Sequence, residues 1–237
     1  MPDCPHLRGT PGRTDLPAAD LLRKPGGSRR HRLPRCGVCG LHRDRCCCAS
    51  LPRARVPQRL ILIQHAVEAE RPTSTGRMAA HCWGNSEALC YGRGRTPMDE
   101  SPLCRPGWTY ALLFPRAGAL PVADWLRAHE DTDPSRTAFV VPDGSWHQAA
   151  HISRRLRALR DMPCIRLPEG PPGFWRIRVP LTPDRLCTAE AVARLLAGLG
   201  HAAAAGAMLD ALRHMHDIMW KMRGWTPRDF DRRETPA

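Results

Sequence analysis

The chain has 237 residues, of which 42% are hydrophobic, so it can bury the core of one sizeable α/β domain with a small appendage. Its formal net charge of +13 favours polyanionic partners, because cationic side chains neutralise phosphates. No run reaches the roughly 18 apolar residues of a membrane span, and the N-terminal stretch lacks the apolar core of a secretory signal. We therefore expect a cytoplasmic protein without a membrane partner.

The N-terminal segment 1–33 is rich in Pro, Gly, Arg and Ser and has no hydrophobic period, which predicts a disordered arm. Residues 1–59 hold 13 Lys or Arg against four Asp, a net charge of +9. A basic arm beside a folded domain is common in nucleic-acid-binding proteins, whereas a generally Arg-rich chain is the competing interpretation.

Residues 34–58 carry a dense cysteine cluster with the spacing C-x2-C-x6-C-x-C. Two pairs of thiolates suit a tetrahedral structural zinc ion, and a reducing compartment favours metal binding over disulfides. Alternate residues of an extended segment point to the same side, so Cys47 is expected to face away. His42 is an alternative ligand, and unpaired thiols are the competing interpretation. The predicted ligands are Cys36, Cys39, Cys46 and Cys48.

From Arg59 onward, short apolar runs alternate with longer helical patterns. This alternation predicts an α/β fold with a mostly parallel sheet covered by helices. Ligands of such sheets bind beyond the carboxyl ends of the strands, so the loops after 64, 114, 141 and 167 are expected to build the site. The predicted strands are 60–64, 110–114 and 138–141, and the predicted helices are 75–83, 119–129, 145–161, 188–199 and 203–223.

The loop after the first strand contains Arg71-Pro-Thr-Ser-Thr-Gly-Arg77 and opens a helix. Hydroxyls and a glycine at a helix start expose backbone N–H groups, which suit a carboxylate or phosphate. Arg71 and Arg77 would contact such an anion or be solvated. Simple helix capping is an equally good interpretation of this loop.

The strand at 138–141 is followed by Asp143-Gly-Ser-Trp146. Ser145 and Gln148 have the spacing of a capping box, so the next helix begins here. Asp143 would then lie just beyond the carboxyl edge of the sheet, where a general base would be placed. An Asp in a turn beside a core Trp is the competing interpretation.

The remaining polar motifs lie on or beside helices. Arg154 and Arg155 belong to a basic helix face that would contact phosphates or water. Thr188 is expected to cap the helix at 188–199, and Glu190 to favour the positive end of its dipole.

Taken in order, these motifs resemble the DTW-domain family of tRNA-uridine aminocarboxypropyltransferases, over roughly residues 34–200. The chain departs from the family signature Asp-x-Thr-Trp at Ser145, which keeps a hydroxyl at the helix start, and carries Ser74 where many members have Asn. The matching motifs are Cys36-x2-Cys39-x6-Cys46-x-Cys48, Gln64-His65 with Glu68, Thr73-Ser-Thr-Gly-Arg77, Leu113-Phe-Pro115, Asp143-Gly-Ser-Trp146, Leu167-Pro168, Arg176-x-Arg178 and Thr188-x-Glu190-Ala191.

The resemblance implies a SPOUT-like knotted catalytic domain over residues 59–237 that transfers the 3-amino-3-carboxypropyl group of S-adenosylmethionine to N3 of a tRNA uridine. Asp143 is the expected base and Glu68 the second choice. We expect no obligate protein partner. The implied donor-binding residues are Ser74, Thr75, Gly76, Phe114, Pro115, Gly144, Ser145, Trp146, Leu167, Pro168 and Thr188. The implied tRNA contacts are the zinc module, Arg71, Arg77, Arg154, Arg155, Arg176 and Arg178.

Two alternatives remain open at this point. A SPOUT-like RNA methyltransferase would use the same donor but transfer its methyl group. A zinc-dependent RNA-binding protein would bind tRNA without turnover. The chain has neither a G-x-G-x-x-G nor a Walker A sequence, which argues against dehydrogenases and kinases.

Overall fold

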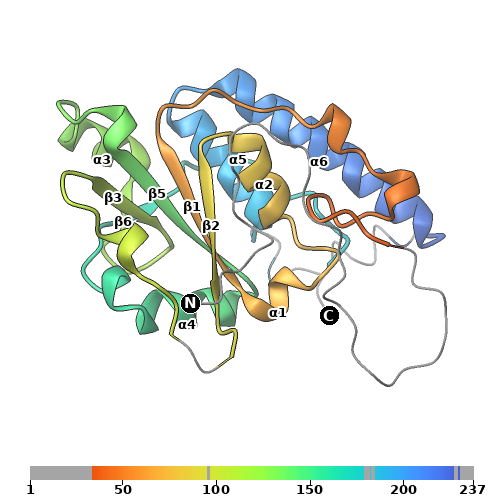
Figure 1. Ribbon diagram of the computed structural model, residues 1–237. Coiled ribbons are helices and arrows are strands. Elements are labelled where there is room, and N and C mark those ends of the chain that lie inside the picture. Colours follow the sequence, from red (N-terminus) through yellow and green to blue (C-terminus); the bar gives the residue numbers. More distant parts are fainter. Residues whose placement is uncertain (1–33, 95–96, 179–181, 183–184, 227–228, 230–237) are drawn as a thin grey trace.

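The computed structural model describes residues 34–94, 97–178, 182, 185–226 and 229. The arm predicted at 1–33 lies outside these residues. The strands form one six-stranded sheet in the order β2-β1-β5-β3-β6-β4, and every pairing between them is parallel (Figure 1). The predicted α/β fold with a mostly parallel sheet is therefore confirmed. The strands are β1 (Arg59–His65), β2 (Ser86–Tyr91), β3 (Thr109–Leu113), β4 (Leu120–Pro121), β5 (Thr137–Asp143) and β6 (Cys164–Arg166).

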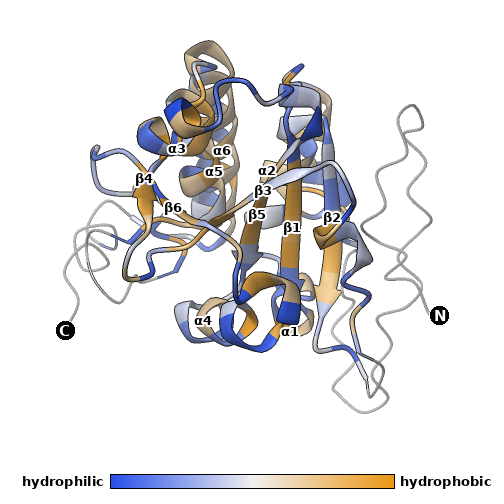
Figure 2. Ribbon diagram, turned by 90° about the vertical axis from the view of Figure 1, so that its left-hand side faces the viewer, coloured by the Kyte–Doolittle hydropathy of each residue, from blue (hydrophilic) through white to orange (hydrophobic). Residues whose placement is uncertain are grey.

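The central strands are the apolar runs that the sequence predicts. All seven residues of β5 are buried, as are five of the seven in β1, because helices cover both faces of the sheet. Figure 2 shows β1 in hydrophobic colours over most of its length. Strands β2, β4 and β6 lie toward the edges and were not predicted, since their short or mixed sequences lack a long apolar run.

The helices differ from the predicted ones at three places. The helix predicted at 119–129 begins only at Val122, because Leu120 and Pro121 pair with β6 as strand β4. A short helix, α1, follows β1 without a predicted counterpart, and the helix predicted at 145–161 ends at Arg155. Leu156 adopts extended dihedrals there, and the side chain of Arg116 donates to the carbonyl oxygens of Ser153 and Arg160, which holds the broken end. The helices are α1 (Ala66–Ala69), α2 (Gly76–Trp83), α3 (Val122–Ala128), α4 (Trp146–Arg155), α5 (Thr188–Gly198) and α6 (Ala202–Met222).

Two hydrophobic clusters cover the two faces of the sheet. The larger cluster contains buried side chains of α2, α3, α5 and α6 together with residues of the cysteine segment. The smaller cluster packs Ile152 of α4 and Leu159 against the other face. Figure 1 shows α2, α5 and α6 grouped on one side, while α1 and α4 lie at the end of the sheet where β1 and β5 end. No helix among the described residues is long and apolar enough to cross a membrane. The knot implied by the resemblance stays a prediction.

Candidate active site and metal site

A buried carboxylate lies at the carboxyl ends of the two central strands. Gln64 of β1 and Asp143 of β5 are paired in register, and Gln64 Nε2 donates to Asp143 Oδ2 at 2.6 Å. Gln64 Nε2 also donates to Ser74 Oγ at 3.0 Å, and Thr188 Oγ1 donates to Asp143 Oδ1 at 2.5 Å. Asp143 is only 2% exposed. One carboxylate thus joins segments that are more than 40 residues apart in the sequence.

Two helices begin at this carboxylate. Gly76 is the first residue of α2, and a Cβ atom there would overlap the carboxylate of Asp143, so only glycine fits without a shift. Thr75, the residue before it, accepts a hydrogen bond from the backbone N–H of Ala189 in the first turn of α5. The partial positive charge of both helix starts favours an anionic group between them. Burial nevertheless raises the pKa of Asp143, opposed by its hydrogen bonds with Thr188 and Gln64.

The start of α5 differs from the prediction in one respect. Cys187, and not Thr188, is the N-cap, because Cys187 has extended dihedrals and Thr188 is the first helical residue; the Thr188 hydroxyl donates to Asp143. Cys187 and Glu190 form a capping box, in which the Glu190 side chain accepts from the backbone N–H of Cys187 at 2.7 Å. The same carboxylate accepts from the backbone N–H groups of Phe174 and Trp175, at 2.6 and 2.9 Å. Glu190 therefore fixes the 174–175 segment to the helix start.

A second carboxylate near the site is held in an ion pair. Glu68 of α1 is buried and receives two hydrogen bonds from the guanidinium of Arg178, at 2.5 and 3.1 Å. Nε of Arg178 also donates to the Thr73 hydroxyl at 2.8 Å. The pair thus connects α1, the loop before α2 and the segment before α5. Arg176, two residues earlier, is buried.

The other predicted RNA-binding arginines differ in their surroundings. The guanidinium of Arg77 donates to the carbonyl oxygens of Ala69 and Arg71, both at 3.2 Å, and so braces the loop before α2. Arg71 is exposed, as are Arg154 and Arg155 in the last turn of α4. Three of the six arginines therefore present their side chains to solvent, and their contact with RNA stays a prediction.

The predicted donor-binding loops meet at the ends of β3, β5 and β6. The rings of Phe114 and Trp146 lie 6.3 Å apart, and the guanidinium of Arg185 lies 4.6 Å from the ring centroid of Trp146. β3 pairs with both β5 and β6, which brings the loop after β6 beside them. The other members of this group are exposed Pro115, half-buried Leu167 and exposed Pro168.

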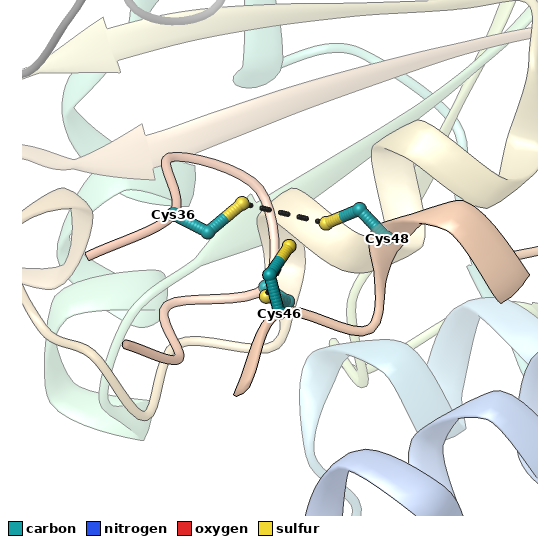
Figure 3. Close-up of side chains that lie close together, drawn as sticks. Cys36, Cys46 and Cys48 are labelled. Carbon is teal, nitrogen blue, oxygen red and sulfur yellow. Dashed lines mark hydrogen bonds between the residues drawn. The ribbon is translucent and has the colours of Figure 1, made fainter. Parts of the chain in front are cut away.

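The cysteine cluster has the dimensions of a zinc site. The sulfur atoms of Cys36, Cys39, Cys46 and Cys48 all lie within 4.8 Å of one another. The sulfur atoms of Cys36 and Cys48 are 3.4 Å apart, and those of Cys39 and Cys46 are 3.8 Å apart. Figure 3 shows the side chains of Cys36, Cys46 and Cys48 pointing toward one another. Sulfur ligands about 2.3 Å from a tetrahedral zinc ion are separated by about 3.8 Å. The four thiols therefore fit zinc, while Cys47 is buried in the larger hydrophobic cluster.

The cysteine segment packs directly against the candidate active site. A Cβ atom at Gly40, which has a φ of 72°, would overlap the carbonyl of Pro72 and lie 3.2 Å from Nη2 of Arg77. Pro72 belongs to the loop that leads into α2, and Arg77 is the second residue of that helix. His42, the alternative ligand, lies outside the group of four thiols. The candidate metal site thus packs against the segment that carries Ser74, Thr75 and Gly76.

The family model of the DTW domain matches residues 33–220. The chain belongs to the DTW-domain family. This membership is consistent with a tRNA-modifying enzyme. No solved structure matches the chain. The match spans the cysteine cluster, the sheet and most of α6, so both candidate sites lie within the DTW domain.

The signature segment of this DTW domain keeps its helix start despite the serine. The Ser145 hydroxyl accepts from the backbone N–H of Gln148 at 3.3 Å, and the Gln148 side chain accepts from the backbone N–H of Ser145 at 2.8 Å. The predicted capping box is confirmed. A Cβ atom at Gly144 would lie 2.9 Å from the side chain of Gln148, so the capping side chain closes over this position.

Two residues of the DTW domain have structural roles that the sequence did not reveal. Gln64 was noted only as part of a motif, yet it is fully buried and contacts both Asp143 and Ser74. A polar residue at the end of a buried strand was the available signal. Glu190 was expected to interact only with the helix dipole, because its contacts with the 174–175 segment depend on tertiary packing.

Proposed function

We propose that this chain transfers the 3-amino-3-carboxypropyl group of S-adenosylmethionine to N3 of a uridine in tRNA. The observation that carries the proposal is the convergence of the family motifs at the carboxyl ends of β1, β5 and β3. Gln64, Asp143 and Thr188 come from distant parts of the sequence and are joined by hydrogen bonds. Ligands of parallel sheets bind at this edge.

The reaction requires alignment and the removal of one proton. As substrate, S-adenosylmethionine supplies an electrophilic γ-carbon. The N3 lone pair of uridine forms the new C–N bond, the C–S bond breaks with its electrons going to sulfur, and neutral methylthioadenosine leaves. The N3 proton must pass to a base. Because the leaving group departs without charge, the protein chiefly has to hold the γ-carbon, and not the methyl carbon, in line with N3.

We assign the adenosine part of the donor to the loops after β3, β5 and β6. The Phe114 and Trp146 rings offer an aromatic surface there, with Gly144, Ser145, Pro115, Leu167 and Pro168 around it. The start of α2, at Ser74, Thr75 and Gly76, would bind the amino acid carboxylate through backbone N–H groups. The zinc module and the arginines at 71, 154 and 155 would bind the tRNA backbone.

We assign the base to Asp143, with Glu68 as the second choice. The raised pKa of Asp143 suits proton acceptance. Its Oδ1 atom accepts from the Thr188 hydroxyl and its Oδ2 atom from Gln64, and each oxygen keeps a second lone pair that can accept the proton. Both oxygens of Glu68 accept from the guanidinium of Arg178.

The decisive experiment is mass spectrometry of nucleosides after unmodified tRNA is incubated with the full-length protein and S-adenosylmethionine. We expect a uridine carrying an aminocarboxypropyl group and an equal amount of methylthioadenosine. A methylated nucleoside with S-adenosylhomocysteine would replace the proposal with the methyltransferase alternative. Binding of tRNA without any product would replace it with the non-catalytic alternative.

A further inference from the structure

A cavity lies beside the candidate active site, at the carboxyl ends of β1 and β2, and the proposed donor site does not use it. It has a volume of about 380 Å³ and is lined by His65, Tyr91, Met98 and His151 together with glycines 92 and 94 and Pro97. A pyrimidine base is flat and small enough for a space of this size. None of these side chains belongs to the assigned donor loops.

The aromatic rings of the cavity are arranged as walls. The ring of Tyr91 lies 6.2 Å from that of His65, with an interplanar angle of 50°, and 6.0 Å from that of His151, edge to face. All three side chains are half-buried. Rings that are tilted against one another leave faces on which an unstacked base can pack.

His65 supplies a directed hydrogen-bond donor. Its Nδ1 atom accepts from the backbone N–H of Val67 at 3.2 Å, so the neutral ring carries its proton on Nε2. Burial and the nearby His151 lower the pKa of His65, which favours this neutral form. A Cβ atom at Gly92 would lie 3.6 Å from Nε2, and the glycine therefore leaves that nitrogen accessible from the cavity.

The cavity and the proposed donor site lie on opposite sides of one loop. In the sheet, β5 lies between β1 and β3, so the loop at 143–146 separates His65 at the end of β1 from Phe114 at the end of β3. The loop packs against His65 of the cavity lining, because a Cβ atom at Gly144 would lie 3.4 Å from the Cβ atom of His65. An acceptor base on one side would thus approach a donor bound on the other.

We propose that this cavity binds the uracil base of the RNA substrate, stacked against Tyr91 and His151, with the uracil O4 oxygen accepting from Nε2 of His65. The inference rests on the proposed function and names its acceptor subsite. The N–H group of His65 is a hydrogen-bond donor and therefore favours uracil over cytosine, because cytosine presents an amino group where uracil has O4. The exposed Arg154 and Arg155, on the same helix as His151, would contact the adjoining phosphates.

The first test is photochemical and independent of turnover. Transfer RNA transcribed with 4-thiouridine is irradiated with the full-length protein, and the cross-linked peptides are identified by mass spectrometry. We expect cross-links at Tyr91, Met98 or His151, and we expect unlabelled tRNA to compete them away. Cross-links confined to other peptides would overturn the proposal, whether or not the wild-type protein forms the aminocarboxypropyl product.

The second test compares two histidines of α4. In His151→Ala the KM for tRNA should rise about tenfold, as the loss of a stacking contact predicts, while the KM for S-adenosylmethionine stays unchanged. The matched control His147→Ala removes an exposed histidine outside the cavity lining and should behave as wild type. Equal KM values for tRNA in both variants would refute the subsite while leaving the proposed reaction in place. Absence of product from wild-type protein would refute the reaction instead, and the cross-links alone would then decide the subsite.

Discussion

Asp143 lies in an environment that disfavours its charged form. Its hydrogen bonds nevertheless connect distant segments of the candidate site. Burial raises its pKa above the ordinary value of 3.8, while Thr188 and Gln64 donate hydrogen bonds to its two oxygens. Since the folded-state pKa is the higher one, its contribution to stability is complete below pH 3.8. That contribution is lost as the pH rises through the folded-state pKa.

Replacement of Asp143 by Asn separates stability from catalysis. The amide carries no charge, so the free energy of unfolding of Asp143→Asn should rise relative to wild type as the pH increases from 3.8 to 7. Turnover should fall about a hundredfold or more if the carboxylate accepts the proton. Denaturant unfolding at several pH values and single-turnover rates measure the two effects. Near-normal turnover in a folded variant would disprove the base assignment, and Glu68→Gln would then be measured next.

Gly76 tests how closely the start of α2 packs on the carboxylate. A methyl group there would overlap Asp143, so Gly76→Ala should lower the free energy of unfolding by about 1–3 kcal/mol. Gly206 in α6 is the matched control, because no atom lies within 4 Å of its Cβ position. Gly206→Ala should raise stability by about 0.5–1 kcal/mol, as alanine favours helix. Equal stabilities of the two variants would mean that α2 does not pack as tightly as described.

At the scale of elements, α5 is attached to the rest of the site through Glu190. Its carboxylate accepts three backbone N–H groups, two from the 174–175 segment and one from Cys187. Substitution of Glu190 by Ala leaves all three donors without this acceptor, and we expect a loss of about 2–4 kcal/mol. The exposed Glu130 provides a control whose replacement by Ala should change stability by less than about 0.5 kcal/mol. Chemical denaturation measures the free energy of unfolding of both variants. A loss in Glu190→Ala no larger than that in Glu130→Ala would mean that Glu190 does not anchor α5.

At the scale of the whole molecule, the candidate metal site and the candidate active site both contact the loop before α2. Gly40 of the cysteine segment packs against Pro72 and Arg77, so loss of zinc should disturb the start of α2 as well as the segment itself. We expect one zinc ion per chain in purified wild-type protein and none in Cys46→Ser, with a lower Tm in the variant. Cys104→Ser, at an exposed cysteine outside the cluster, should keep both the metal and the Tm. Elemental analysis measures the zinc content, and thermal unfolding measures the Tm. Full zinc content in Cys46→Ser would contradict the assigned ligand set.

The sequence by itself determined the fold class, the strands β1, β3 and β5, and a cluster of four cysteines that could hold zinc. Strands such as β1 and β5 are buried on both faces of the sheet, so their sequences are nearly continuous apolar runs that can be recognised without the structure. The cysteine ligands lie within 13 consecutive residues, so their spacing alone predicts a cluster. The Ser145 capping box is equally local, because both partners belong to one helix turn.

The tertiary structure decided what the polar residues of the site contact. The hydrogen bonds of Asp143 with Gln64 and Thr188, and of Arg178 with Glu68, join residues 45 to 110 positions apart. Strand order brings these residues together, and no local pattern records strand order. The end of α4 was mispredicted for the same reason, since Arg116 from another loop holds the carbonyls where the helix breaks. Local periodicity predicts elements, whereas the partners of a buried charge depend on which elements become neighbours.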